Sequence, residues 1–139
     1  MEVINSDTIS AVLQAIKFNA DGLVPAIAQQ HDDGEVLMMA WMNETAVRET
    51  LQTGRVHYWS RSRNALWRKG ESSGQEQALK DFRWDCDNDT VLVLVDQTGV
   101  ACHTGRRNCF FNAVRGGSIE VISEIETDQA SLYGRAENK

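Results

Sequence analysis

The chain is organised around residues 84–109, which read WDCDNDTVLVLVDQTGVACHTGRRNC and contain all three cysteines of the protein. Residues 91–95 alternate valine and leucine, and β-branched and apolar side chains of this kind predict a buried strand. Residues 97–99 predict a turn, after which Val100 would begin a returning strand. The resulting hairpin would carry Cys102 back toward Cys86 at one end of a sheet.

The acidic residues of this segment predict a site for a divalent cation. Asp85, Asp87 and Asp89 alternate along the chain, so in an extended conformation they share one face and leave Cys86 on the other. Three neighbouring negative charges repel one another, which favours a bound cation, and carboxylate oxygens suit Mg²⁺. The alternative is an acidic turn that is simply solvated.

The three thiols predict a zinc site. Cys86, Cys102 and Cys109 lack the CxxC spacing of structural zinc modules, whereas a catalytic zinc keeps three protein ligands and an open position for water. Two alternatives stay open: His103 as the fourth ligand of a closed site, and reduced cysteines in the core. A catalytic zinc also needs a proton acceptor, and the candidates are His103, His57 and Glu71. Histidine is favoured because its pKa lies near neutrality, at about 6.5.

Whole-chain properties limit the kind of protein that carries this segment. The 139 residues are expected to form one domain, residues 1–139, with the 42% hydrophobic and 24% charged composition of a globular protein. A net charge of −6 argues against a nucleic-acid partner, because such binding needs a broad basic face. We see no secretory signal and no apolar run near the roughly 18 residues of a membrane span, so we expect no membrane partner. Three cysteines cannot all form disulfides, which fits a reducing cytoplasm.

The remaining pattern predicts an α+β fold, with a mostly antiparallel sheet and about two short helices. One helix is expected over residues 9–18, with Ser6, Asp7 or Thr8 as its cap. A second is expected over residues 44–52, between Asn43 as N-cap and Gly54 beyond its end. Further strands are expected at residues 23–29, 35–41, 55–60, 77–84 and 118–125. Residues 110–114 are expected to pack on the sheet, and the polar tail, residues 127–139, is expected to fray.

Three details of this prediction concern particular side chains. Pro25 suits an edge strand or the first residue of a strand, because it cannot donate to a ladder. Ala78, Phe82 and Trp84 alternate and should share one face of their strand. The paired Met38 and Met39 are interpreted as core-filling residues.

Residues 55–74 form a basic segment in an acidic chain, and they predict phosphate binding. Residues 61–74 have no clear helical or strand period, and structureless segments of this length in compact domains are usually functional or disordered. Guanidinium groups, serines and glycine amides match phosphate oxygens, and aromatic rings stack on bases. The residues of these types are Tyr58, Trp59, Arg61, Arg63, Trp67, Lys69, Ser72 and Ser73. The alternative is a solvated basic loop.

Together these motifs resemble the phosphoribosyl-AMP cyclohydrolase family, which acts in the third step of histidine biosynthesis. The motifs are MMAWMN at 38–43, HYWSRSRNALWRKGESSG at 57–74, and DCDNDT at 85–90 with ACHTGRRNCFF at 101–111, within a motif core at 22–111. The resemblance implies that Asp85, Asp87 and Asp89 bind Mg²⁺ and that Cys86, Cys102 and Cys109 bind Zn²⁺. It also implies an intertwined homodimer in which the zinc site is shared, with Cys86 coming from the partner subunit. We expect no second, pyrophosphohydrolase domain such as many family members have, so the resemblance implies a monofunctional enzyme.

The implied reaction is hydrolysis of the N1–C6 bond in the adenine ring of 1-(5-phosphoribosyl)-AMP by zinc-activated water, assisted by Mg²⁺. His103 or His57 would accept the proton. The substrate has two phosphates: Arg61, Arg63, Lys69, Ser72 and Ser73 would hold one, and Thr104, Gly105, Arg106 and Arg107 would hold the other. Trp59, Ser62 and Glu71 are further expected substrate-binding residues. Two other functions compete with this one: a non-catalytic, zinc-stapled module that binds a nucleotide or RNA, and a Mg²⁺-dependent nucleotide pyrophosphohydrolase.

Overall fold

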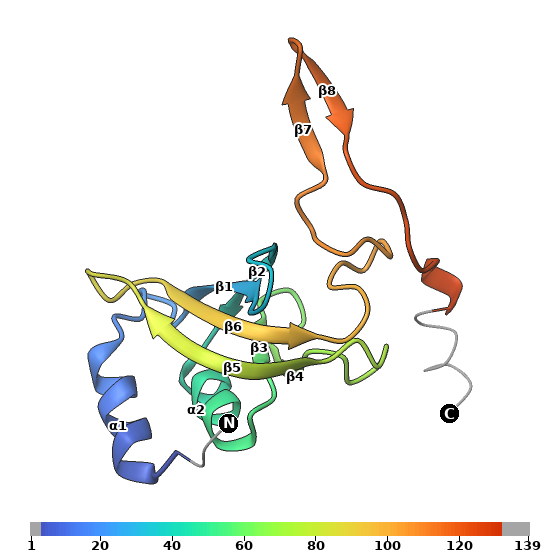
Figure 1. Ribbon diagram of the computed structural model, residues 1–139. Helices are drawn as coiled ribbons and strands as arrows, with labels where there is room; N and C mark the ends of the chain where they lie inside the picture. Colours follow the sequence, from blue (N-terminus) through green and yellow to red (C-terminus); the bar gives the residue numbers. More distant parts are fainter. Residues whose placement is uncertain (1–3, 132–139) are drawn as a thin grey trace.

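The computed structural model describes residues 4–131 of the chain (Figure 1). Within this range the regular elements, in chain order, are α1 (Ser6–Ala15), β1 (Val24–Gln30), β2 (Val36–Met42), α2 (Glu44–Thr53), β3 (His57–Ser60), β4 (Ala65–Arg68), β5 (Gln77–Trp84), β6 (Val91–Gln97), β7 (Asn112–Arg115) and β8 (Ser118–Val121). A further helical turn begins at Gln129. No helix in the described range is both long enough and apolar enough to span a membrane.

Six strands form one curled sheet, and this confirms the predicted α+β class. Their order is β4-β3-β2-β1-β6-β5, and every pairing is antiparallel except that of β1 with β6. The sheet curls far enough for the segment before β3 to reach β5. Val56 N donates to Gln77 O at 3.0 Å, and Leu79 N donates to Gly54 O at 2.8 Å. This curl brings the end of β4 close to the segment that follows β6.

Both helices begin at an asparagine cap. Asn43 Oδ1 accepts a hydrogen bond from Ala46 N at 2.8 Å, and Gly54 ends α2 in the left-handed conformation with φ of 73°, as predicted. The start of α1 was predicted too late. Its cap is Asn5, whose Oδ1 accepts from Thr8 N at 2.8 Å, and the helix ends at Ala15 because Ile16 is extended.

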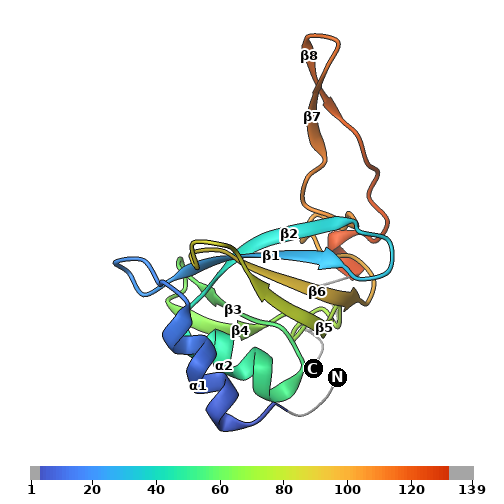
Figure 2. The same ribbon diagram turned by 60° about the vertical axis from the view of Figure 1, so that its left-hand side comes forward.

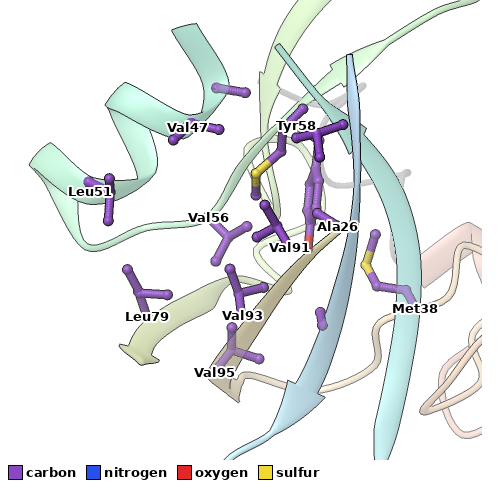
Figure 3. Packing of buried hydrophobic residues seen from close by; sticks show 14 of the residues in the cluster. Ala26, Met38, Val47, Leu51, Val56, Tyr58, Leu79, Val91, Val93 and Val95 are labelled. Atoms are coloured by element: carbon purple, nitrogen blue, oxygen red, sulfur yellow. The ribbon is translucent and has the colours of Figure 1, made fainter. Parts of the chain in front are cut away.

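The hydrophobic core lies between the helices and one face of the sheet. Val91, Val93 and Val95 of β6 are fully buried there, and α2 contributes Val47 and Leu51 from the opposite side (Figure 3). Burial of each such side chain stabilises the fold by about 1.5–3 kcal/mol. The alternating burial along β6 explains why this strand was predictable.

The predicted hairpin between β6 and residues 100–102 is wrong. β6 lies between β1 and β5, so both of its edges are already hydrogen-bonded and no free edge remains for a returning strand. Residues 98–109 instead form a series of turns. Cys109 N donates to Leu37 O at 2.8 Å and ties these turns to β2.

Three smaller predictions also need correction. A bulge between Leu79 and Asp81 shifts the alternation of β5, so Leu79, rather than Ala78, shares the core-facing side with Phe82 and Trp84. Pro25 lies in an interior strand, which tolerates it because the parallel ladder with β6 begins only at Ala26. The short strand β4 falls inside residues 61–74, where no period was visible.

Residues 112–121, predicted in part to pack on the main sheet, do not pair with it. β7 and β8 pair with each other alone and form a hairpin that projects from the body on the side opposite the helices (Figures 1 and 2). We call residues 112–121 the arm. Val114 and Ile119 are paired on one face of the arm and are 79% and 81% exposed.

The beginning of the predicted tail is hydrogen-bonded instead of frayed. Within the predicted tail, Thr127 N donates to Gly105 O at 3.1 Å and Gln129 Nε2 donates to His103 O at 3.1 Å; just before it, Glu126 N also donates to Gly105 O, at 2.8 Å. The rest of the predicted tail, residues 132–139, lies outside the described residues.

Candidate active site

Three carboxylates converge at the turn between β5 and β6. Asp85, Asp87 and Asp89 each place one oxygen within 4.8 Å of the others. The turn, and not an extended strand as predicted, brings them together. Asp85 Oδ1 accepts from Asp89 N at 3.0 Å and from Thr90 N at 3.2 Å, and Asn88 takes a φ of 67° at the tip.

The close approach of these carboxylates separates their pKa values. A hydrogen bond with Asp87, then desolvation and the charges of Asp87 and Asp85, raise the pKa of Asp89. Desolvation also acts to raise the pKa of Asp85, but the hydrogen bonds that it accepts outweigh desolvation and lower its pKa. This is the electrostatic setting in which a divalent cation stabilises the ionised cluster.

Two of the three thiols lie together at the other end of β6. Cys102 is buried, Cys109 is half-buried, and Thr104 Oγ1 donates to Cys102 Sγ at 3.1 Å. Burial, followed by the proximity of Cys102, raises the pKa of Cys109 to about 12. Lys69 Nζ donates to Ala101 O at 2.7 Å beside this thiol pair, and burial lowers the pKa of Lys69 while the two thiols act in the opposite direction.

Cys86 is far from this pair within one chain. It is exposed on the turn that precedes Val91, whereas Cys102 follows Gln97, so the seven residues of β6 separate them, a length of about 20 Å. Within residues 4–131 the three thiols do not form a cluster that could share one ion. A zinc site with all three would need a second copy of the chain.

Two adjoining pockets open near the thiol pair, and Cys109 lines the first of them. The first, which we call the cysteine pocket, has a volume of about 290 Å³ and is lined by Met38, Arg63, Trp67, Arg68, Lys69, Gly70, Glu71, Ser72, Ser73, Ala101, His103 and Cys109. The second, the tryptophan pocket, has a volume of about 840 Å³ and is lined by Met39, Ala40, Trp41, Trp59, Ser60, Arg61, Ser62, Arg63, Trp67 and His103. Arg63, Trp67 and His103 line both, so the two pockets adjoin.

The basic segment therefore divides between the two pockets. β3 and β4 pair and hold the turn that carries Arg61, Ser62 and Arg63, and the chain after β4 carries Lys69 to Ser73. The Trp67 ring packs against the ring of Tyr58, with 5.1 Å between ring centroids, and Tyr58 is fully buried. A rigid aromatic wall thus lies between the two groups of predicted phosphate-binding residues.

The structure does not bring every predicted site residue to these pockets. His57 is almost fully buried, its Nδ1 lies 2.8 Å from Arg55 O, and it lines neither pocket. The segment Thr104, Gly105, Arg106 and Arg107 is also outside both pockets, because its side chains are engaged elsewhere. Arg106 Nε donates to Ser123 O at 3.0 Å, and Arg107 donates to Gln97 O at 3.3 Å and lies 3.5 Å from Glu35.

Sequence reasoning missed several pocket residues on β2. Trp41 lines the tryptophan pocket and has the Arg61 guanidinium 4.9 Å from its ring centroid. Met39, interpreted as core-filling, is 40% exposed in that pocket, whereas Met38 is buried and also lines the cysteine pocket. The MMAWMN motif could have indicated these pocket residues. Adjacent residues of a strand face opposite sides, so Met38 and Met39 could not both point into the core.

Comparison with known proteins identifies the family. A family model described as phosphoribosyl-AMP cyclohydrolase matches residues 38–111, which is more than half of the chain. The chain belongs to the phosphoribosyl-AMP cyclohydrolase family.

Curated relatives agree with this assignment. The chain is 63% identical to a phosphoribosyl-AMP cyclohydrolase of Rhodospirillum centenum over an alignment of 127 residues. This alignment covers 91% of the chain and 96% of the relative. It is also 65% identical to a phosphoribosyl-AMP cyclohydrolase of Alkalilimnicola ehrlichii, and the alignment covers 91% of this chain and 89% of that relative. The identity to the phosphoribosyl-AMP cyclohydrolase of Paramagnetospirillum magneticum is again 65%, over 89% of this chain and 94% of that relative. The cyclohydrolase match includes every residue that lines the two pockets, the three aspartates and the three cysteines, and it ends where the arm begins.

Proposed function

We propose that this chain hydrolyses the N1–C6 bond in the adenine ring of 1-(5-phosphoribosyl)-AMP, as the names of its relatives suggest. The observation that carries the proposal is one pocket lined by the Cys109 thiol, a lysine, two serines and an exposed histidine, with the buried Cys102 next to Cys109. Thiols are metal ligands, hydroxyl and amide groups bind phosphate, and a histidine moves protons near neutral pH. These are the groups that a hydrolytic ring opening of a nucleotide requires.

Substrate binding would use both pockets. Ser72 and Ser73 would hold one phosphate in the cysteine pocket, and Arg61 and Ser62 would hold the other in the tryptophan pocket. The purine would stack on Trp67 between the two phosphate sites, and Trp59 would form part of the wall of the tryptophan pocket. Phosphates fixed at both ends orient the ring, and such positioning supplies much of the rate of many enzymes.

The residues present fit two different metals. Cys102 and Cys109 are adjacent soft ligands at a pocket, and with Cys86 of the partner subunit they would hold zinc with one position open. The converging oxygens of Asp85, Asp87 and Asp89 are hard ligands that would hold Mg²⁺. When bound, zinc would supply a water molecule of increased acidity, and Mg²⁺ would neutralise the carboxylates and stabilise the turn.

His103 is the proton acceptor that the geometry favours. It is exposed and borders both pockets, whereas His57 is buried outside them. His103 would take a proton from the attacking water as oxygen adds to C6. N1 would take up a proton as the N1–C6 bond breaks, which leaves the ring opened and both phosphates attached.

A homodimer would complete the site. The face of the sheet opposite the helices carries Ile27, Leu92 and Met39 in one row, because the registers pair Ile27 with each of the other two. Met39 is 40% exposed, yet strands that are apolar on both faces are usually covered on both. The arm projects on this side (Figure 2) and has its own exposed apolar face. A second copy would cover these surfaces and supply Cys86 to the thiol pair.

The direct test follows ring opening by ultraviolet absorbance with phosphoribosyl-AMP and metal-loaded protein. We expect turnover by the wild type, and loss of both turnover and stoichiometric zinc in Cys102→Ser. An active, zinc-free Cys102→Ser protein would refute the role of the thiols. Release of pyrophosphate or phosphate without ring opening would indicate a nucleotide pyrophosphohydrolase, and steeply salt-dependent polynucleotide binding without turnover would indicate a binding module.

A further inference from the structure

Lys69 occupies an unusual electrostatic position. Its backbone N donates to Val56 O at 2.9 Å, which fixes the residue at the end of β4, and its Nζ donates to Ala101 O at 2.7 Å. Ala101 directly precedes Cys102, and both Lys69 and Cys109 line the cysteine pocket. The ammonium group is therefore held between β4 and the thiol pair.

This ammonium lacks the partner that a partly buried charge normally has. Among residues 4–131, no carboxylate lies within 4 Å of Lys69 Nζ, whereas Arg55 and Arg68 both face Glu76 at 3.7 Å. A charge removed from water is costly unless an opposite charge or sufficient hydrogen bonds compensate it. An ammonium has three N–H donors and Ala101 O uses one, so two remain for an anion.

We propose that the anion is the ionised pair Cys102 and Cys109, and that Lys69 is a positioning residue that stabilises the thiolates as metal ligands instead of binding substrate phosphate. The inference rests on the zinc site of the proposed function. Three thiolates exceed the charge of Zn²⁺ by one, and a single lysine restores neutrality. Such outer contacts orient and stabilise ligands, and their loss typically weakens metal binding about 10- to 100-fold.

The test compares full-length wild type with Lys69→Met, which preserves length and removes the charge, and with Lys69→Arg, which keeps the charge. Arg63→Met is a matched control in the same pocket. Zinc affinity is measured by competition with a chromogenic chelator, and KM for phosphoribosyl-AMP is measured at saturating zinc. We expect Lys69→Met to bind zinc about 10- to 100-fold more weakly with unchanged KM, and Lys69→Arg to recover most of the affinity. Arg63→Met should show the reverse, a raised KM with unchanged zinc affinity.

Two results would overturn the assignment. Unchanged zinc affinity with raised KM in Lys69→Met would make Lys69 a phosphate ligand, and equal losses in Lys69→Met and Lys69→Arg would show that charge is not what matters. If Lys69→Met does not fold by circular dichroism, Lys69→Gln takes its place, because it keeps an N–H donor without the charge, and wild-type zinc affinity in that variant would refute the proposal. A wild type that binds no zinc would instead refute the zinc site itself.

Discussion

At the scale of single residues, two histidines compete for the role of proton acceptor, and their surroundings differ. His103 is exposed in the turns after β6 and borders both pockets, whereas the His57 ring lies beside the Arg55 carbonyl in the interior. Removing a general base typically costs about 10²- to 10⁴-fold in rate. We therefore expect His103→Ala to lower kcat by this factor and to retain zinc, as measured by steady-state kinetics and metal analysis.

His57→Gln is the control for this prediction. It should unfold at a lower denaturant concentration, because a nearly buried ring is replaced, while the folded protein keeps a kcat close to that of the wild type. The reverse pattern, with kcat lost only in His57→Gln, would contradict the assignment. Loss of zinc from His103→Ala would make His103 a metal ligand.

The metal residues show how far residue-level prediction reaches. Residue chemistry alone pointed to Asp85, Asp87 and Asp89 as a group, and the carboxylates do converge. The predicted reason was wrong, since a tight turn with Asn88 at positive φ brings them together. The alternation of residue types along the sequence does not predict this turn. The conformation of the turn depends on hydrogen bonds from Asp89 N and Thr90 N to Asp85 Oδ1.

At the scale of elements, the segment between β4 and β5 forms one wall of the cysteine pocket, and its shape depends on glycine. Gly70 has a φ of 89°, and an added Cβ would lie 2.7 Å from the backbone of Gln75 and Glu76. Gly74 has a similar φ of 77°, but an added Cβ would meet nothing within 4 Å. At both positions an L residue would bear the conformational cost of a left-handed backbone, but only at Gly70 would its Cβ also overlap with neighbouring backbone atoms.

Gly70→Ala should consequently be more damaging than Gly74→Ala. We expect it to lower the free energy of unfolding by about 1–3 kcal/mol more than Gly74→Ala does, because the backbone must move. It should also raise KM, since Glu71, Ser72 and Ser73 would shift with the loop. Urea denaturation and steady-state kinetics of the two variants check this, and equal losses in both would show that the close packing at Gly70 is unimportant.

The elements also separate what the sequence could predict from what it could not. Residues 77–84 match β5, and Asn43 and Gly54 delimit α2, because capping and apolar alternation are local signals. The bulge after Leu79 and the parallel pairing of β1 with β6 depend on contacts between distant segments. The hairpin predicted after β6 was wrong for the same reason. Local sequence does not show that both edges of β6 are already paired, with β1 and with β5.

At the scale of the whole molecule, the arm has an apolar face that stays exposed among the described residues, 4–131. Val114 and Ile119 lie opposite each other, and Ala113 and Glu120 lie on the other face. A lysine pair on the apolar face would place charge in the proposed subunit contact. If the proposed homodimer and its zinc site form as described, we expect Val114→Lys with Ile119→Lys to give monomers that lack zinc, as measured by sedimentation and metal analysis.

Arg115→Glu is a control on the arm face away from Val114, and it should remain dimeric with zinc bound. A doubly substituted arm that still forms zinc-loaded dimers would show that the arm face is not part of the contact.

The proposed site is built from two chains, and mixing two inactive variants tests this most directly. Cys86→Ser and Cys102→Ser should each be inactive alone, because every site in either dimer lacks one thiol. After subunit exchange in an equal mixture, half of the dimers are mixed, and each mixed dimer has one intact site of two. Phosphoribosyl-AMP ring opening should then recover to about a quarter of the wild-type rate. No recovery, despite mixed dimers detected by mass spectrometry, would contradict a zinc site shared between subunits.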